Sequence, residues 1–123
     1  MGARVEVKEV PLDEMPKLYA QADVVVVPSL EHEGTSLSAV EGILSGKPVI
    51  VSHIGGLGNI VINQLNGYVC NLTPESLANK IREAIRFSPL SQSHGVYGAC
   101  CTALGKERWE KEVWDILQSA LGL

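Results

Sequence analysis

Four consecutive valines at Val24–Val27 decide the class of fold, because this run shows no alternation of apolar and polar side chains. A strand with one wet face alternates, so an unbroken run predicts a strand buried on both faces, as in the interior of a parallel sheet. A second short apolar run at Val49–Val51 has the same character. Parallel strands need a crossover connection, usually a helix. The sequence therefore predicts an α/β fold built on a parallel sheet.

Two further strands and several helices are expected around this pair. Arg4–Val10 alternates apolar and polar residues up to Pro11, which is typical of a strand with one exposed face. Asn66-Gly67 predicts a turn into a last short strand at Tyr68–Cys70. Apolar residues at helical spacing predict helices at 12–22 with Asp13 as N-cap, from Ser36 or Ser38 to Ser45, at 74–85 after Thr73, and from Lys106 onward.

The expected architecture is a Rossmann-like parallel sheet of about four strands flanked by helices, within one domain of 123 residues. Residues 1–87 form the α/β core in this prediction, and residues 88–123 form C-terminal helices. We expect Gly55–Gly58 to be a flexible loop and Phe87–Gly105 to be a loop with a short helix, because neither segment has a strong apolar period.

Charge and composition exclude several classes of function. Ten Lys and Arg against fourteen Asp and Glu give a formal charge of −4, whereas a nucleic-acid surface needs a basic stripe. The apolar runs are too short for a transmembrane segment, and Met1–Val5 carries no apolar leader. Cys70, Cys100 and Cys101 are an odd number of cysteines and show no zinc-ligand spacing with the histidines. We therefore expect a cytoplasmic protein in a reducing compartment that binds neither nucleic acid nor metal.

The segment Pro28–Glu41 offers a ligand site, because it leaves the carboxyl end of a predicted strand and leads into a helix. Ligands of open α/β sheets bind in that crevice, and free amides at a helix start favour an anion such as phosphate. Gly34 admits a ligand close to the backbone, and the carboxylates of Glu33 and Glu41 suit the hydroxyls of a polyhydroxylated ligand. In the competing interpretation, Ser38 and Glu41 form a capping box, and glutamates of a polar loop are merely solvated. Spacing leaves both interpretations open.

Five blocks of the sequence carry a resemblance when they are taken together: Ala22–Ser29, Glu33–Glu41, Gly46–Val49, Gly55-Gly56 and Asn66–Val69. In content and order they resemble the C-terminal domain of the group 1 (family 4) retaining glycosyltransferases, which have the two-domain GT-B fold. Glu33 and Glu41 match the family's two glutamates separated by seven residues. The resemblance covers roughly Val5–Phe87 and, more loosely, the tail.

The resemblance assigns roles to the residues that follow the valine strand. Glu33 would be the catalytic-site residue that hydrogen-bonds hydroxyls of the donor sugar, and Glu41 would bind the ribose of the nucleotide. The remaining substrate-binding positions are Gly34, Thr35 and the backbone amides of Ser36, Leu37 and Ser38, which would cradle the diphosphate. The family moves a hexose from a nucleoside-diphosphate sugar to a hydroxyl acceptor with retention of configuration, with no cofactor and generally no metal. Here Thr35-Ser36 stands where the family often has Phe-Gly.

The sequence also lacks parts that the family carries. The N-terminal acceptor-binding domain has no counterpart here, nor do the strand and helix that supply an Arg and a Lys to the diphosphate. The resemblance thus implies a truncated nucleotide-sugar-binding domain that is inactive alone, with a nucleotide sugar and the missing acceptor domain as its partners. The absent strands would leave Val24–Val27 with an open apolar edge. We expect either Arg4–Val10 to move in beside that edge or a second copy to pair across it as a homodimer.

Five further residues have two interpretations each. Gly55 and Gly56 either admit the donor closely or serve turn chemistry alone. His53 either contacts the sugar or is a satisfied, partly buried histidine. Trp109 and Trp114 are most simply core residues, although the family's last helix often crosses to the other domain, which would leave part of its apolar surface without a partner here.

Two rival functions remain from the sequence. The first is another GT-B enzyme, a nucleotide-sugar epimerase, which the missing N-terminal half would distinguish from a transferase. The second is a non-enzymatic α/β interaction module that binds a partner through its sheet edge. Substitutions at Glu33 and Glu41 that leave function intact would favour this second rival.

Overall fold

The computed structural model of the chain describes residues 6–87 and 94–122. Its centre is a parallel sheet of three strands in the order β1-β2-β3, formed by β1 (Val25–Val27), β2 (Val49–Ser52) and β3 (Gly67–Cys70). The prediction of an α/β fold on a parallel sheet is confirmed, with three strands in the described part of the chain rather than about four.

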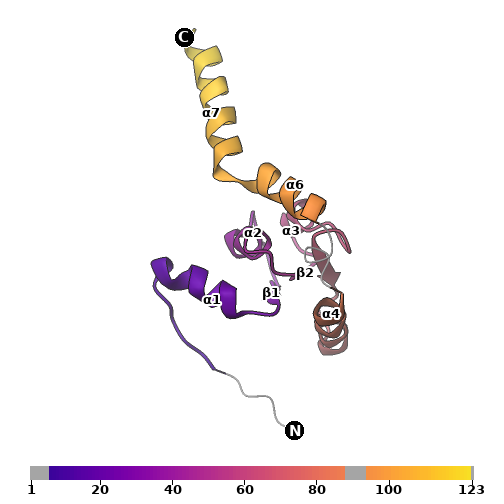
Figure 1. Cartoon of the computed structure of the whole chain (residues 1–123). Coiled ribbons are helices and arrows are strands. Elements are labelled where there is room, and N and C mark those ends of the chain that lie inside the picture. Colours follow the sequence, from indigo (N-terminus) through magenta and orange to yellow (C-terminus); the bar gives the residue numbers. More distant parts are fainter. Residues whose placement is uncertain (1–5, 88–93, 123) are drawn as a thin grey trace.

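Helices cover both faces of this sheet (Figure 1). On one face, α2, α3 and α6 pack against the sheet, and on the other face α4 does. The helices in chain order are the 3-10 turn η1 (Leu12–Glu14) and the α-helices α1 (Met15–Gln21), α2 (Leu37–Leu44), α3 (Leu57–Ile60), α4 (Pro74–Arg86), α6 (His94–Leu104) and α7 (Lys106–Leu121).

The middle strand, β2, is buried on both faces. Val49 and Val51 lie in the core under α2 and α6, Ile50 lies in the core under α4, and all three side chains are fully buried. The valines at 24–27 are only half-buried. Complete burial on both faces is therefore confirmed for Val49–Val51. Val24–Val27 pack against the core on both faces but are only half-buried, because β1 is the edge strand and has a paired neighbour on one side only among the described residues.

Local signals place the helix boundaries. Ser36 is the N-cap of α2 and its hydroxyl accepts from the Ala39 amide at 3.4 Å. Gly46, just beyond α2, has φ +73°, the left-handed conformation that glycine adopts without strain. Thr73 caps α4 by accepting from the Ser76 amide at 3.2 Å, and Pro74 is the first helical residue. The predicted ends of α2 and the start of α4 are confirmed.

The strand expected at residues 4–10 is wrong where the structure describes it. Residues 6–10 form no strand, and the side chain of Val7 is 94% exposed. Arg4 and Val5 lie outside the described residues. Alternation sets which side chains would share a face, but a strand also needs a neighbour for its backbone bonds, and this segment has none among the described residues. It does not cover the edge of β1, and pairing of that edge with a second copy stays a prediction.

Four smaller expectations also need correction. The loop expected at residues 55–58 continues into the short helix α3, and the helix expected within residues 87–105 is the 11-residue α6. Asp13 lies inside η1 and is not a cap. Trp109 and Trp114, expected in the core, are 65% and 56% exposed, because α7 leaves the body of the molecule after α6 (Figure 1).

The Asn66 side chain hydrogen-bonds to the backbone of the segment before β3, and its removal should destabilise the fold. The Asn66 side chain is buried: its Oδ1 accepts from the Ile62 amide at 2.8 Å in a part-buried bond, and its Nδ2 donates to the Ile60 carbonyl at 2.9 Å in a buried one. We expect Asn66→Ala to lower the free energy of unfolding in urea by about 2–3 kcal/mol, because it leaves these backbone groups unsatisfied. Asn63→Ala, which removes one exposed bond to the Val69 amide, should cost about 1 kcal/mol or less. Equal losses in the two variants would contradict this account.

Candidate functional site

The loops that follow β1 and β2 pack directly on each other at the carboxyl end of the sheet. The Gly56 amide donates to the Glu33 carbonyl at 2.9 Å, and the buried Ser52 hydroxyl donates to the Ser29 carbonyl at 2.6 Å. Gly55 has φ +54°, and a Cβ there would lie 2.0 Å from the Glu33 carbonyl oxygen. The two glycines therefore allow the loops to approach, and a role for them in admitting the donor stays a prediction.

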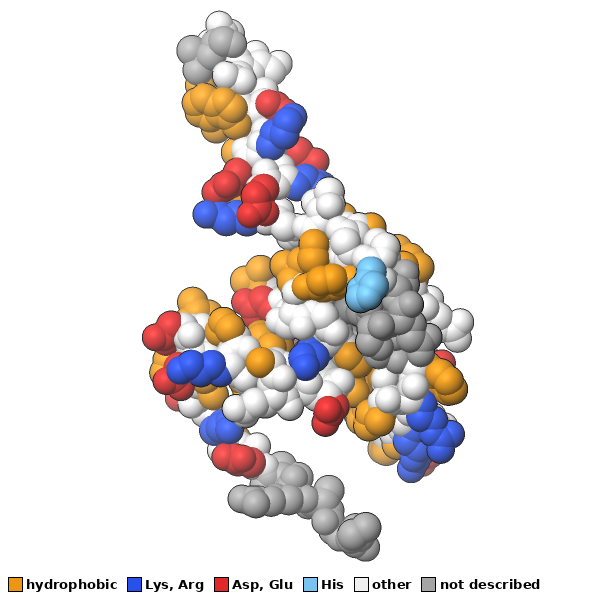
Figure 2. Space-filling model, viewed as in Figure 1, with side chains coloured by type: hydrophobic (Ala, Val, Ile, Leu, Met, Phe, Trp, Pro, Cys, Tyr) orange, Lys and Arg blue, Asp and Glu red, His pale blue; other side chains and the backbone are white. Residues whose placement is uncertain are grey.

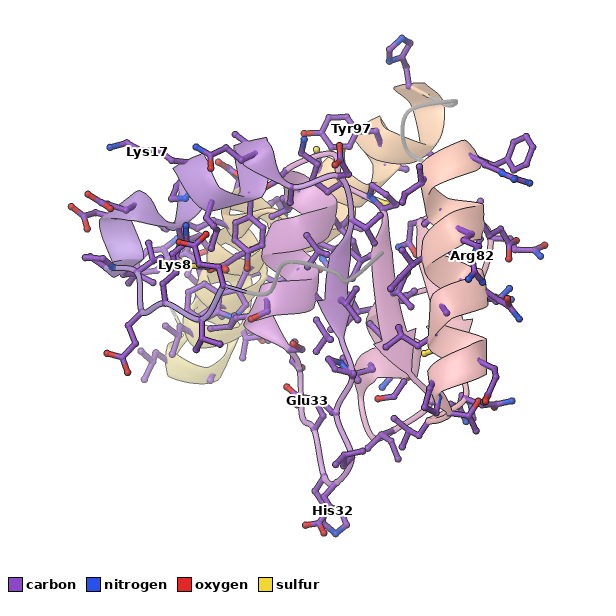
Figure 3. The ribbon with its side chains drawn as sticks, turned by 90° about the horizontal axis from the view of Figure 1, so that it is seen from below. Lys8, Lys17, His32, Glu33, Arg82 and Tyr97 are labelled. Carbon is purple, nitrogen blue, oxygen red and sulfur yellow. The ribbon has the colours of Figure 1, made fainter. Side chains whose placement is uncertain are left out.

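Glu33 is half-buried in the loop after β1. Its Oε2 accepts a hydrogen bond from the Ser29 hydroxyl at 2.7 Å, which fixes the carboxylate relative to the end of the strand. The carboxylate keeps further lone pairs free for other donors. Figure 3 shows Glu33 below the carboxyl ends of the strands and the exposed His32 at the loop tip, directed away from it.

The start of α2 offers free backbone donors. The first amides of an α-helix have no acceptor within the helix. At α2 the Ala39 amide is satisfied by the Ser36 hydroxyl, and Ser36 itself is buried. The Leu37 and Ser38 amides remain available, and the helix dipole places partial positive charge beside them. This end of α2 suits an anionic group.

Glu41 is held by a residue from α1. The Tyr19 hydroxyl donates to Oε2 of Glu41 at 2.8 Å, and Tyr19 is buried while Glu41 is half-buried. The capping-box interpretation of Ser38 and Glu41 is wrong, because the N-cap is Ser36 and the Glu41 carboxylate bonds to Tyr19. Tyr19 was not among the predicted site residues, because it lies in the helix expected at residues 12–22 and no sequence signal marks a bond to a residue 22 positions away.

Burial and the contact with Glu41 shift the pKa of Tyr19. Burial, the hydrogen bond to Glu41 and the charge of Glu41 all raise the pKa of Tyr19 above 10.0, and the Ser38 hydroxyl partly opposes them. Because the folded pKa lies above the unfolded one, this group stabilises the fold below pH 10.0, and that contribution is lost as the pH rises through the folded pKa. We expect Tyr19→Phe to remove from the tyrosinate absorbance of the native chain one component that titrates above pH 10.0. Loss of a component at or below pH 10.0 would contradict this bond.

Three other expected site residues, Gly34, Thr35 and His53, are exposed. Gly34 and Thr35 are exposed beside the start of α2, and a Cβ on Gly34 would meet no atom within 4 Å. His53 is exposed, so its interpretation as a partly buried histidine is wrong.

Within the described ranges, no three His, Cys, Asp or Glu side chains come together as a metal site. No helix of the described residues is long and apolar enough to cross a bilayer.

Two hollows border the loop between β1 and α2. The first is an apolar pocket of about 310 Å³ between the ends of β1 and β3, lined by Pro28, Leu30, Cys70, Asn71, Leu72, Thr73, Pro74 and Leu77. The second is a groove of about 710 Å³ between α2 and the base of α7, where Thr35, Leu37 and Trp109 are among the lining residues. Ser36, Ser38 and Glu41 line neither hollow.

Comparisons with known proteins show the family of this chain. Residues 2–86 match the family described as glycosyl transferases group 1. The chain is 37% identical over 105 residues to an uncharacterized glycosyltransferase of Methanocaldococcus jannaschii. That match covers 85% of this chain and 29% of the relative, so the chain spans less than a third of that curated relative's length.

Solved structures show the same fold. The C-terminal domain of a group 1 family glycosyl transferase from Francisella tularensis aligns with a TM-score of 0.64 and 27% identity, over 80% of this chain and 51% of that domain. The Anabaena protein HepE, solved in complex with UDP, aligns with a TM-score of 0.77 and 24% identity, over 86% of this chain and 30% of HepE.

The sheet, its helices and the helix start at its carboxyl end are thus part of a GT-B glycosyltransferase domain. The chain belongs to the group 1 glycosyltransferases.

Proposed function

We propose that this chain is the donor-binding portion of a retaining glycosyltransferase that moves a hexose from a nucleoside-diphosphate sugar to a hydroxyl acceptor. The observation that carries the proposal is the start of α2, where free amides at Leu37 and Ser38 stand next to a carboxylate fixed by Tyr19. HepE, a structural neighbour, is solved with UDP, which supports a nucleoside diphosphate as the ligand here.

Each part of the donor has a matching group in this proposal. The diphosphate accepts hydrogen bonds from the Leu37 and Ser38 amides at the positive end of the α2 dipole. The ribose hydroxyls donate to Glu41, whose carboxylate keeps lone pairs free beside the bond from Tyr19. The sugar hydroxyls donate to Glu33, which Ser29 holds at the end of β1. The proposed chemistry rests on positioning and charge stabilisation at the leaving diphosphate.

We infer weak donor binding and no transfer by this chain alone. The segment 28–41 contains Glu31, Glu33 and Glu41 and no Lys or Arg, so this chain offers the diphosphate no cation there. Charged partners strengthen phosphate recognition, and the amides alone provide neutral donors only. Acceptor binding and the remaining diphosphate contacts belong, in this proposal, to parts that the family carries and this sequence lacks.

We also propose a reducing, cytoplasmic location. All three cysteines are free, and Cys100 and Cys101 stand next to each other on α6 without a disulfide. Structural disulfides form and persist in oxidising compartments, so free cysteines fit a reducing one.

Amide chemical shifts on titration with UDP, GDP and ADP test the donor-binding proposal. We expect chemical-shift changes that cluster at residues 33–41 and saturate in the millimolar range. Because this site holds the diphosphate and ribose, the three nucleotides should give similar changes, and nucleosides that lack phosphate should give clearly different ones. Shifts confined to the apolar pocket beyond β3, or scattered over the surface, would contradict the proposal. An intact α/β interaction module without a donor site would give no saturable shifts at all.

A further inference from the structure

The loop between β1 and α2 carries Glu33 but has no regular secondary structure of its own. Residues 28–35 form neither helix nor strand, and several of them, such as Leu30 and His32, are exposed. A carboxylate on such a loop keeps one orientation only if bonds to a rigid element hold it. The position of Glu33 therefore depends on the element to which this loop is bonded.

No ion pair with Lys or Arg holds Glu33 among the described residues. The ion pairs in this part of the chain lie within residues 6–8, within α4 and within α7. Figure 2 shows charged side chains of both signs along α7 and basic ones over α4. The bond that fixes the Glu33 carboxylate is the one from the Ser29 hydroxyl at 2.7 Å. The orientation of the carboxylate therefore follows the position of Ser29.

Ser29 is in turn held by β2. Ser52, the last residue of β2, is fully buried, and its hydroxyl donates to the Ser29 carbonyl at 2.6 Å. β1 ends at Val27, and the next residue, Pro28, has no amide to donate to a neighbouring strand. The Ser52 hydroxyl thus supplies a bond between β2 and the loop after β1, just beyond the end of the backbone ladder.

The loop that follows β2 also fixes the backbone of Glu33. The Gly56 amide in that loop donates to the Glu33 carbonyl at 2.9 Å. Glu33 is therefore bonded at its backbone by Gly56 and at its side chain by Ser29, and both connections lead to β2. Since β2 is the middle strand of the sheet and is buried along its whole length, it offers this loop a rigid support.

We propose that Ser52 is a positioning residue of the donor site, which acts on the Glu33 carboxylate through Ser29. We name the two hydrogen bonds that join these residues the Ser52 relay. This inference rests on the proposed function, in which Glu33 accepts hydrogen bonds from hydroxyls of the donor hexose. The bond from Ser29 occupies one lone pair of Oε2, so the other lone pairs of the carboxylate remain for the hexose. Because the relay orders the carboxylate beforehand, binding of the hexose does not have to immobilise it.

The Ser52 relay concerns the hexose and not the diphosphate. The Leu37 and Ser38 amides and the Glu41 carboxylate belong to α2, and the relay does not include them. Loss of the Ser52 hydroxyl should therefore weaken binding of UDP-glucose and leave binding of UDP unchanged. If Ser52 only supported the fold, its loss would change both affinities alike or neither of them.

Three-bond coupling constants of the Glu33 side chain, measured by NMR on the full chain without ligand, test the relay itself. We expect one dominant χ1 rotamer in the native chain and averaged couplings in both Ser29→Ala and Ser52→Ala. Tyr97→Phe is the matched control, because it also removes a hydroxyl that donates to a backbone carbonyl, that of Leu44, at 2.7 Å. This control should keep the native Glu33 couplings. Native couplings in Ser52→Ala would overturn the proposal.

Ser52→Cys separates the lost bond from any damage to the fold. The thiol has nearly the size of the hydroxyl but is a weak donor, so the Glu33 couplings should lie between those of the native chain and those of Ser52→Ala. Circular dichroism and urea unfolding show whether each variant is folded. If Ser52→Ala did not fold, Ser52→Cys would decide, and native couplings in this variant would overturn the proposal.

Shift titrations with UDP and UDP-glucose test what the relay contributes to binding. We expect UDP-glucose to bind about threefold to tenfold more weakly to Ser52→Ala and to Ser29→Ala than to the native chain, because one further side chain must be ordered on binding. The affinity for UDP should be the same in all three. Equal changes for the two ligands in Ser52→Ala, or no change for either, would overturn the proposal. Failure of the proposed function would appear in the native chain, as an absence of saturable shifts, whereas failure of this inference appears only in the variants.

Discussion

Gly55→Ala is expected to lower the free energy of unfolding by about 2–4 kcal/mol and to displace Glu33 from its position in the site. The added Cβ would lie 2.0 Å from the Glu33 carbonyl oxygen, and the residue has φ +54°, so both the contact and the backbone conformation oppose a side chain. Urea unfolding measures the first effect. Loss of UDP-induced shifts at residues 33–35 measures the second.

Gly58→Ala is the matched control for this prediction. Gly58 lies in α3, has no positive φ, and a Cβ there would meet no atom within 4 Å. Alanine in a helix is favoured over glycine by roughly 0.5–1 kcal/mol, so this variant should be as stable as the native chain or slightly more so. If both variants unfolded at the same urea concentration, the close approach of the two loops would be disproved.

Glu41→Gln is expected to weaken UDP binding about tenfold to a hundredfold, since hydrogen bonds to a charged group contribute roughly 1.5–3 kcal/mol. Pyrophosphate has no ribose, so its affinity should stay the same or rise slightly once the negative charge beside the anion is gone. The opposite responses of the two ligands assign Glu41 to the ribose. Isothermal titration calorimetry or shift titration measures both.

Glu31→Gln and Tyr19→Phe complete this test. Glu31 is an exposed residue of the same loop and serves as the matched control, for which UDP affinity should not change. Tyr19→Phe frees the carboxylate that Tyr19 now holds at 2.8 Å and should weaken UDP binding less than Glu41→Gln, without affecting pyrophosphate. A loss of affinity for both ligands in Glu41→Gln would contradict the assignment and indicate general damage to the fold.

The features that the sequence predicted correctly depend on neighbours within a few residues. The buried strand Val49–Val51, the glycine after α2 and the Thr73-Pro74 helix start all have their determinants inside one short segment. Capping and turn chemistry act over three or four residues, so sequence patterns identify them. The order of the family's blocks supplied the rest of the site assignment.

Contacts between distant segments were not predictable in this way. Tyr19 and Glu41 are 22 residues apart, and the close approach of Gly55 to Glu33 joins loops from different strands. The first contact arises only when α1 packs against α2, and the second only when β1 and β2 pair and bring the loops that follow them together. Likewise, the alternation at residues 4–10 and the apolar side of α7 identify side chains that would be favourable to bury. Neither pattern identifies the surface that would cover them.

Intermolecular nuclear Overhauser effects between UDP and the chain test the central claim most directly. We predict contacts from the ribose protons to the side chains of Ser38 and Glu41. The diphosphate then lies between the ribose and the first amides of α2. Ribose contacts to Leu72 and Leu77 in the pocket beyond β3 would instead place the nucleotide elsewhere on the sheet and contradict the account.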